Sequence, residues 1–193
     1  MDYTLTIEGA PETVPGGTSI MLLHPSTGET DRLDTEFFKT DTDHLFILST
    51  RTTAREVQQK LEYYEVDESK AVILDTLSIE RGYSRRAGDH VRYVSSPDDL
   101  DGMVEDLREF LEETEGKRRV SVDSVTEMAY YADEERARAA VEEMLDLLRE
   151  HDAIGLFHVA EEVHDEAVLD GYRDLFDGVI HLREDDSVTC DFF

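Results

Sequence analysis

The sequence predicts an α/β fold, a three-layer sandwich in which helices cover both faces of a mostly parallel central sheet. Short, continuously apolar runs alternate along the chain with amphipathic stretches at helical spacing. The 193 residues suffice for one sizeable core, and neither a repeat nor a linker divides them, so we expect a single domain over residues 1–193. Hydrophobic residues make up 39% of the chain, which favours a folded protein despite its high charge.

In the first part of the chain, an alternating stretch at 3–8 predicts an antiparallel strand at a sheet edge, followed by a turn at Val14–Gly17. Apolar runs that predict strands buried on both faces follow at 19–23, 44–48 and 70–75. Between them we expect a helix over about 30–38. A capping box at Thr53–Glu56 begins a second helix, which ends near Tyr64.

In the second part, we expect an exposed loop over residues 78–90 before a short strand at 91–94. Ser96-Pro97-Asp98-Asp99 predicts a helix start, with serine as the cap and proline at the first position, and Gly116 ends this helix. Further strands are expected at 119–123, 153–159 and 179–182, with helices around 137–148 and 164–176. The last two strands, with 188–193 closing a hairpin, are expected as antiparallel additions.

The charge of the chain is extreme, with a formal net charge of −28 and only four lysines among 19 basic residues. Such acidity is typical of a protein from a high-salt cytoplasm, because at about 1 M salt the Debye length falls to roughly 3 Å. It disfavours nucleic-acid binding. Cys190 is the only cysteine, so no intramolecular disulfide forms, and no apolar run reaches the length of a membrane span. We therefore expect a cytoplasmic, halophilic protein.

The stretch from Leu23 to Thr30, LHPSTGET, stands where a phosphate-binding loop would lie, between a buried strand and a helix start. That loop requires the pattern G-x-x-x-x-G-K-[ST]. Gly28 and Thr30 match it, whereas Leu23 replaces the first glycine and Glu29 replaces the lysine. The pattern indicates a degenerate phosphate site.

Five segments in a characteristic order carry a family resemblance: VPGGTSIMLLHPSTGET, HLFILSTRTTAREV, VRYVSSPDDL, RRVSVDSVTEM and LFDGVIHLRED. Together they span nearly the whole chain. The sequence thereby resembles the RecA superfamily, and within it the KaiC-like ATPases of archaea. This resemblance implies a RecA-like P-loop NTPase fold with a nucleotide site at a subunit edge.

The resemblance also implies that catalysis has been lost. In active relatives the loop lysine neutralises phosphates, and a catalytic glutamate follows the second buried strand. Here that place reads Ser49-Thr50-Arg51-Thr52, with no acid before Glu56. We therefore expect no catalytic residues and no bound cofactor. A vestigial nucleotide site remains, whose residues are Gly28, Glu29, Thr30, Asp123 and Ser124.

Other candidate sites have both a functional and a structural interpretation. Asp123, Ser124, Thr126 and Glu127 form a residual cation site or a capped strand end, and Glu29 could join Thr30 and Asp123 there. His158, His164 and Asp165 match no metal-ligand spacing, so we expect structural roles, and a turn role for His24. Cys190 is expected in the core, and the tyrosine pairs 63–64 and 130–131 as half-buried packing. Arg81, Arg85 and Arg86 are a solvated loop or a partner contact.

From these observations we expect a pseudo-ATPase that regulates or scaffolds through protein–protein contacts. Its partner would be a second copy or an active KaiC/RecA-like homologue. The alternative is a nucleotide-binding sensor that does not hydrolyse, based on Gly28, Thr30 and Asp123.

Overall fold

The computed structural model describes residues 1–83, 88 and 90–193. Ten strands lie within them: β1 (Asp2–Thr4), β2 (Thr13–Pro15), β3 (Ser19–His24), β4 (His44–Ser49), β5 (Ala71–Asp75), β6 (Val91–Tyr93), β7 (Arg118–Asp123), β8 (Ile154–Ala160), β9 (Gly178–Leu182) and β10 (Val188–Phe192). The helices are α1 (Asp31–Lys39), α2 (Ala54–Tyr63), α3 (Leu100–Glu113), α4 (Val125–Tyr131), α5 (Glu134–Glu150) and α6 (Glu166–Arg173), with two short 3₁₀ turns, η1 (Glu68–Lys70) and η2 (Glu161–Val163).

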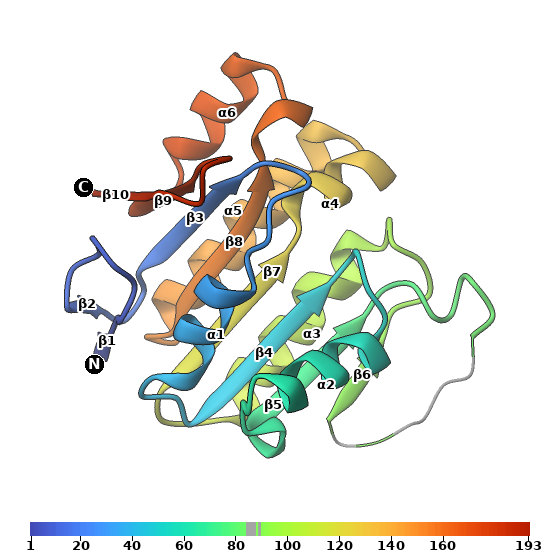
Figure 1. Ribbon diagram of the computed structural model, residues 1–193. Helices are drawn as coiled ribbons and strands as arrows, with labels where there is room; N and C mark the ends of the chain where they lie inside the picture. The colour runs from blue at the N-terminus through green and yellow to red at the C-terminus, as the bar shows by residue number, and fades with distance from the viewer. Residues whose placement is uncertain (84–87, 89) are drawn as a thin grey trace.

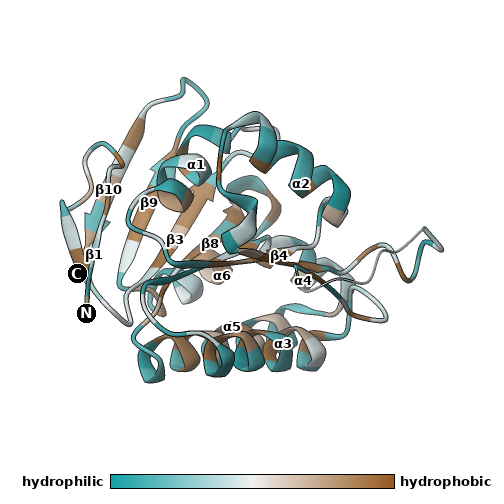
Figure 2. Ribbon diagram, turned by 90° about the horizontal axis from the view of Figure 1, so that it is seen from below, coloured by the Kyte–Doolittle hydropathy of each residue, from teal (hydrophilic) through white to brown (hydrophobic). Residues whose placement is uncertain are grey.

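The main sheet has the strand order β10-β9-β3-β8-β7-β4-β5-β6 within the described residues. All neighbours in it pair in parallel except β10, which runs antiparallel to β9. Helices α1 and α2 cover one face, and α3 and α5 cover the other (Figures 1 and 2). The predicted three-layer α/β sandwich with a mostly parallel sheet is confirmed.

Two hydrophobic clusters, one on each side of the sheet, form the core. The larger includes Phe46, Phe110, Met144 and Phe157 beneath α3 and α5, and the smaller includes Phe37 beneath α1. Strands β3, β4, β7 and β8 are almost wholly buried, as their continuous apolar runs predict. Their carboxyl ends meet at one edge of the sheet, where parallel α/β folds place their sites.

The terminal strands depart in part from the prediction. β1 does not extend the main sheet, because it pairs with β2 in a separate two-stranded sheet. Its alternating residues instead pack against the core: Tyr3 is buried, and its hydroxyl donates to the carbonyl of Asp152 at 2.8 Å. β9 runs parallel to β3, so only β10 is an antiparallel addition to the main sheet.

One helix start was predicted wrongly, and one short helix was not predicted. Ser96 does not cap α3, because its carbonyl accepts the N–H of Asp99 at 3.1 Å and closes a turn. Asp99 is the cap, and its carboxylate accepts the N–H of Gly102 at 3.0 Å. Helix α4 was missed, since its seven residues are too few for a clear helical period.

Gly155, inside β8, lies where a side chain has no room. A Cβ added there would stand 2.6 Å from Leu148 Cδ1 and 2.7 Å from Phe157 Cε2. We expect Gly155→Ala to lower the free energy of unfolding by about 1–3 kcal/mol through overpacking, measured by urea denaturation. Gly171→Ala is the matched control, because its Cβ would meet only the end of the Arg138 side chain, at 2.7 Å. Equal stability of the two variants would contradict the crowding at Gly155.

Candidate functional site

At the carboxyl edge of the sheet, four ionisable side chains from different elements meet in what we call the buried charge cluster: Asp34, Arg51, Asp123 and His158. Asp34 comes from α1, Asp123 from the end of β7 and His158 from the middle of β8. Arg51 comes from the turn between β4 and α2. His158 is completely buried, whereas the side chain of Asp123 is 21% exposed. The cluster therefore lies just beneath the surface of this edge.

Contacts between acidic and basic side chains hold the cluster together. The Arg51 guanidinium contacts both carboxylate oxygens of Asp123, with Nε 2.7 Å from Oδ1 and Nη2 donating to Oδ2 at 3.0 Å. His158 Nε2 lies 2.7 Å from Asp34 Oδ1, and His158 Nδ1 lies 3.7 Å from Asp123 Oδ1. Thr30 Oγ1 donates to the other oxygen of Asp34 at 2.8 Å. The imidazole of His158 thus lies between two carboxyl groups, and the guanidinium of Arg51 pairs with one of them, that of Asp123.

These contacts shift the pKa values of both central groups. Burial alone would lower the pKa of His158, but the Asp123 and Asp34 carboxylates outweigh it, so the pKa of His158 is raised. Burial would raise the pKa of Asp123, but His158 and Arg51 hold that pKa below its ordinary value. Both shifts favour the charged forms, an imidazolium against two carboxylates.

His24, the last residue of β3, lies beside this cluster and not in a turn as predicted. It is 1% exposed, and its ring meets that of His158 edge-on at 5.3 Å. Its Nδ1 lies 2.8 Å from the carbonyl of Pro25, and burial together with the charge of His158 lowers its pKa. The pKa values of the two neighbouring histidines are therefore shifted in opposite directions.

The loop between β3 and α1 is closed by contacts within the protein. The Ser26 N–H donates to the Glu162 carboxylate at 2.7 Å, and the Ser26 hydroxyl also contacts it. These bonds lower the pKa of Glu162. The Gly28 N–H donates to the Pro25 carbonyl at 2.8 Å, and a Cβ at Gly28 would stand 3.0 Å from that same oxygen. A glycine suits this tight turn.

The structure brings only part of the predicted vestigial site together. Thr30 and Asp123 are linked through Asp34 and His158. Glu29 is exposed and lines a different place, a shallow groove of about 460 Å³ whose walls include Arg32, Tyr64, Leu182 and Asp186. Asp34, which the sequence prediction did not include, takes the position expected of Glu29.

Ser124 has a structural role in the described contacts. It is the N-cap of α4, where its hydroxyl accepts the Glu127 N–H at 3.3 Å, and its own N–H donates to Thr50 Oγ1 at 2.7 Å. The capped-strand-end interpretation of this segment is thereby confirmed for Ser124.

His164, the other histidine considered, joins a second network. Its Nε2 lies 2.9 Å from Thr126 Oγ1 and its Nδ1 lies 2.6 Å from Glu134, which also accepts the Tyr172 hydroxyl at 3.0 Å. This network connects α4, α5 and α6. Among the residues that the structure describes, no group of three histidine, cysteine or acidic side chains is placed to hold a metal ion.

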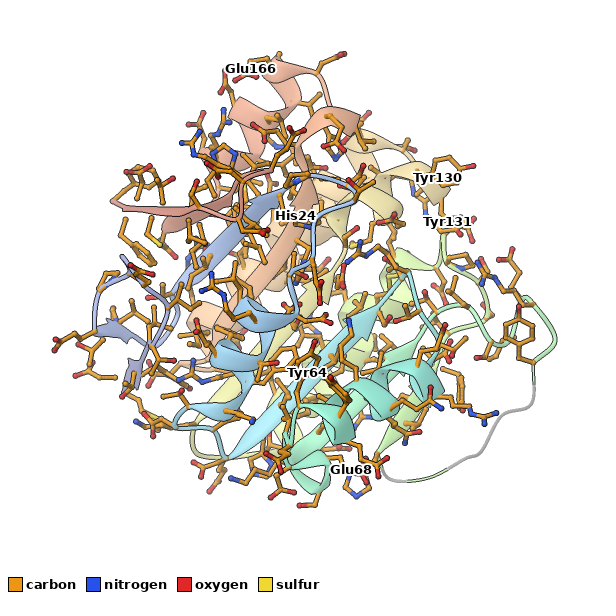
Figure 3. The ribbon with its side chains drawn as sticks, in the orientation of Figure 1. His24, Tyr64, Glu68, Tyr130, Tyr131 and Glu166 are labelled. Carbon is orange, nitrogen blue, oxygen red and sulfur yellow. The ribbon has the colours of Figure 1, made fainter. Side chains whose placement is uncertain are left out.

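Three further predictions have mixed outcomes. Cys190 is half-buried and not in the core, since β10 is an edge strand. Tyr63 and Tyr130 are 79% and 81% exposed, so only the second member of each tyrosine pair is half-buried. Figure 3 shows Tyr130 and Tyr131 at the periphery of the molecule. Arg81 is exposed, while Arg85 and Arg86 lie outside the described residues.

Sequence reasoning missed Asp34, Arg51 and Glu162. A signal existed for Asp34, because it stands next to Leu33 on the side of α1 that the apolar spacing buries. Arg51 was noted only as a residue standing where an acid was expected. Its pairing with Asp123 needs the register of β4 against β7, which places Ser49 opposite Asp123.

Within the described residues no helix is both long and apolar enough to span a bilayer. The fold itself is similar to two solved structures from Pyrococcus horikoshii OT3. One is the KaiC-like protein PH0186, with a TM-score of 0.63 and 14% identity over 97% of this chain and 86% of that one. The other is PH0250, with a TM-score of 0.63 and 10% identity over 92% and 87% of the two chains. At such identities the similarity shows the KaiC-like, RecA-type fold alone.

Two comparisons concern the sequence. No curated protein matches the chain. A family model described as "Family of unknown function (DUF7090)" matches residues 1–192, almost the full length. The chain therefore belongs to the DUF7090 family, and its fold is similar to that of a KaiC-like protein.

Proposed function

We propose that this chain is a catalytically inactive KaiC/RecA-like protein that regulates or scaffolds through protein–protein contacts in the cytoplasm of a halophilic archaeon. The observation that carries the proposal is the ion pair of Arg51 with Asp123. Asp123 matches the acid that orients Mg²⁺ and its water in active relatives, and Arg51 stands near the place of their catalytic glutamate. A guanidinium therefore takes the carboxylate that a metal ion would need.

The electrostatics of this replacement oppose Mg·ATP. Two unit charges about 4 Å apart interact by roughly 4 kcal/mol at an effective dielectric of 20, and a divalent ion beside Arg51 would meet about twice that repulsion. In active relatives a glutamate acts as the base for the attacking water, and near that place Arg51 provides a permanent cation instead.

The loop between β3 and α1 is poorly suited to bind a phosphate group. Active loops aim backbone N–H groups at the β- and γ-phosphates. Here the Ser26 N–H binds the Glu162 carboxylate and the Gly28 N–H binds the Pro25 carbonyl. Glu29 replaces the lysine, so the charge it adds is negative. These features support loss of hydrolysis.

The test is an ATPase assay with Mg·ATP in molar KCl. We expect no phosphate release above the protein-free blank from the wild-type protein or from Glu29→Lys, because the lysine alone restores neither a base nor a free Asp123. Asp123→Ala is the control variant. Turnover that Asp123→Ala abolishes would show that the site is catalytic and would overturn the proposal.

A second candidate function is a nucleotide-binding sensor that does not hydrolyse, favoured by the retention of Gly28, Thr30 and Asp123. Calorimetric titration with Mg·ATP and with other nucleotides, in molar KCl, separates the two. Micromolar binding that Asp123→Ala abolishes would support the sensor and contradict a pure scaffold. Affinity capture from the native host at native salt would then identify the partner, a second copy or an active homologue.

A further inference from the structure

Strand β10 is the outermost strand of the main sheet, next to β9 (Figures 1 and 2). Its side chains alternate: Val188, Cys190 and Phe192 are half-buried, whereas Thr189 and Asp191 are exposed. Edge strands are commonly protected from pairing by proline, by charged side chains, especially lysine, or by a bulge. Residues 188–192 contain neither proline nor lysine, Asp191 is their one charged residue, and their pairing with β9 is regular throughout. This edge is therefore open to another strand.

The hydrogen bonds to β9 fix which backbone groups of β10 point outward. The Phe193 N–H donates to Asp177 at 3.0 Å, and the Arg183 N–H donates to Ser187 at 2.9 Å. In an antiparallel pair the hydrogen-bonded positions alternate. Odd-numbered residues of β10 therefore bond to β9, and the N–H and C=O groups of Val188, Cys190 and Phe192 point away from the sheet.

We propose that two copies of this chain associate by antiparallel pairing of β10 with β10, about a two-fold axis at Cys190. In this register Cys190 faces its own copy and Val188 faces Phe192 of the second copy. Every outward-pointing N–H and C=O of the strand then has a partner, and each opposed pair exchanges two backbone hydrogen bonds. An interface of this kind is isologous and closes as a dimer.

Side-chain charge favours this register over the one in which the axis is shifted to Asp191. With the axis at Cys190, Asp191 lies opposite Thr189 of the second copy. A shift of the axis to Asp191 would place two carboxylates directly opposite, which is destabilising. It would also leave Val188 without a partner. The net charge of −28 on each copy opposes association unless salt screens it, so the dimer needs high ionic strength.

This inference deepens the proposed function, since it names a second copy as one contact partner. The β10 dimer and the loss of ATP hydrolysis can nevertheless be tested independently. A monomer would leave the absence of hydrolysis untouched, and ATPase activity would not remove the pairing of β10.

Because Cys190 is the only cysteine, a disulfide between two copies can form only between their Cys190 residues, which the proposed two-fold axis places opposite each other. Residues opposed in a hydrogen-bonded pair have Cα atoms about 5.5 Å apart, within the range a disulfide requires. We expect wild-type protein in molar KCl with copper–phenanthroline and oxygen to form a covalent dimer. The control is Thr189→Cys in a Cys190→Ser background, whose cysteines face Asp191 and not each other. It should cross-link about tenfold more slowly.

Charge substitutions at Thr189 test the register without a cross-link. Measured by sedimentation equilibrium in a Cys190→Ser background, Thr189→Lys should tighten the dimer and Thr189→Asp should weaken it, each by about threefold or more. Cys190→Pro removes an outward N–H but no bond to β9, so it should give a folded monomer by circular dichroism. A monomeric wild type, or a dimer indifferent to both Thr189 substitutions, would overturn the proposal.

Discussion

Replacing His158 with leucine is expected to lower the free energy of unfolding by about 3–5 kcal/mol, the cost of removing one partner from a buried ionic network. The substitution leaves Asp34 and Asp123 facing each other without the imidazole that lies between them. The space is filled by a side chain of similar size, so a cavity contributes little. Urea denaturation at constant KCl measures the change.

The matched control for that substitution is His181→Leu. His181 Nε2 also lies close to a carboxylate, 2.9 Å from Glu161, but the histidine side chain is 21% exposed and that of the glutamate 40%. Exposed ion pairs contribute about 0–1 kcal/mol, so the loss should be small. A His158→Leu variant no less stable than His181→Leu would show that the buried charge cluster adds nothing to stability.

The combined contribution of His24 and His158 to stability should be greatest near pH 6.5, the ordinary pKa of histidine, because their pKa values are shifted in opposite senses. The raised pKa of His158 means that the native state keeps a proton which the unfolded state loses above that pH. Stability is then lost as pH rises through the folded-state pKa. The lowered pKa of His24 means that below pH 6.5 the unfolded state binds the extra proton, so stability falls as pH decreases.

On each side of pH 6.5, the titration of one of these histidines changes the free energy of unfolding by at most about 1.4 kcal/mol per pH unit, the value for one proton. Urea denaturation from pH 5 to 8 at constant KCl, with about half-unit steps, resolves this. His158→Leu should abolish the decrease in stability above pH 6.5, and His24→Phe should abolish the decrease below pH 6.5. A profile unchanged in both variants would assign the pH dependence to other groups.

The layered fold could be predicted from sequence because its strands are continuous apolar runs and its helices have regular apolar spacing. Leu45–Leu48 and Val120–Val122 needed no tertiary knowledge to be recognised as buried. The direction of β9 was harder, since neither the length of a strand nor its apolarity determines which neighbour it pairs with.

The candidate site could be predicted only where a local motif existed. Gly28 and Thr30 could be found because they match the phosphate-loop pattern, and Asp123 because it ends an apolar strand. Arg51 and His158 reach Asp123 only through strand pairing, so the sequence alone did not indicate these contacts. The structure adds the ion pair of Arg51 with Asp123.

The buried charge cluster also has a consequence for the order of folding. His158 and Asp34 are separated by 124 positions along the chain, and Arg51 and Asp123 by 72. Closing such long loops is costly, and buried ions gain from pairing only after water has been excluded by the strands around them. These contacts therefore form late, after β3, β7 and β8 have assembled. Interactions absent from the transition state act chiefly on the rate of unfolding, so the cluster slows the opening of the native protein without hastening its formation.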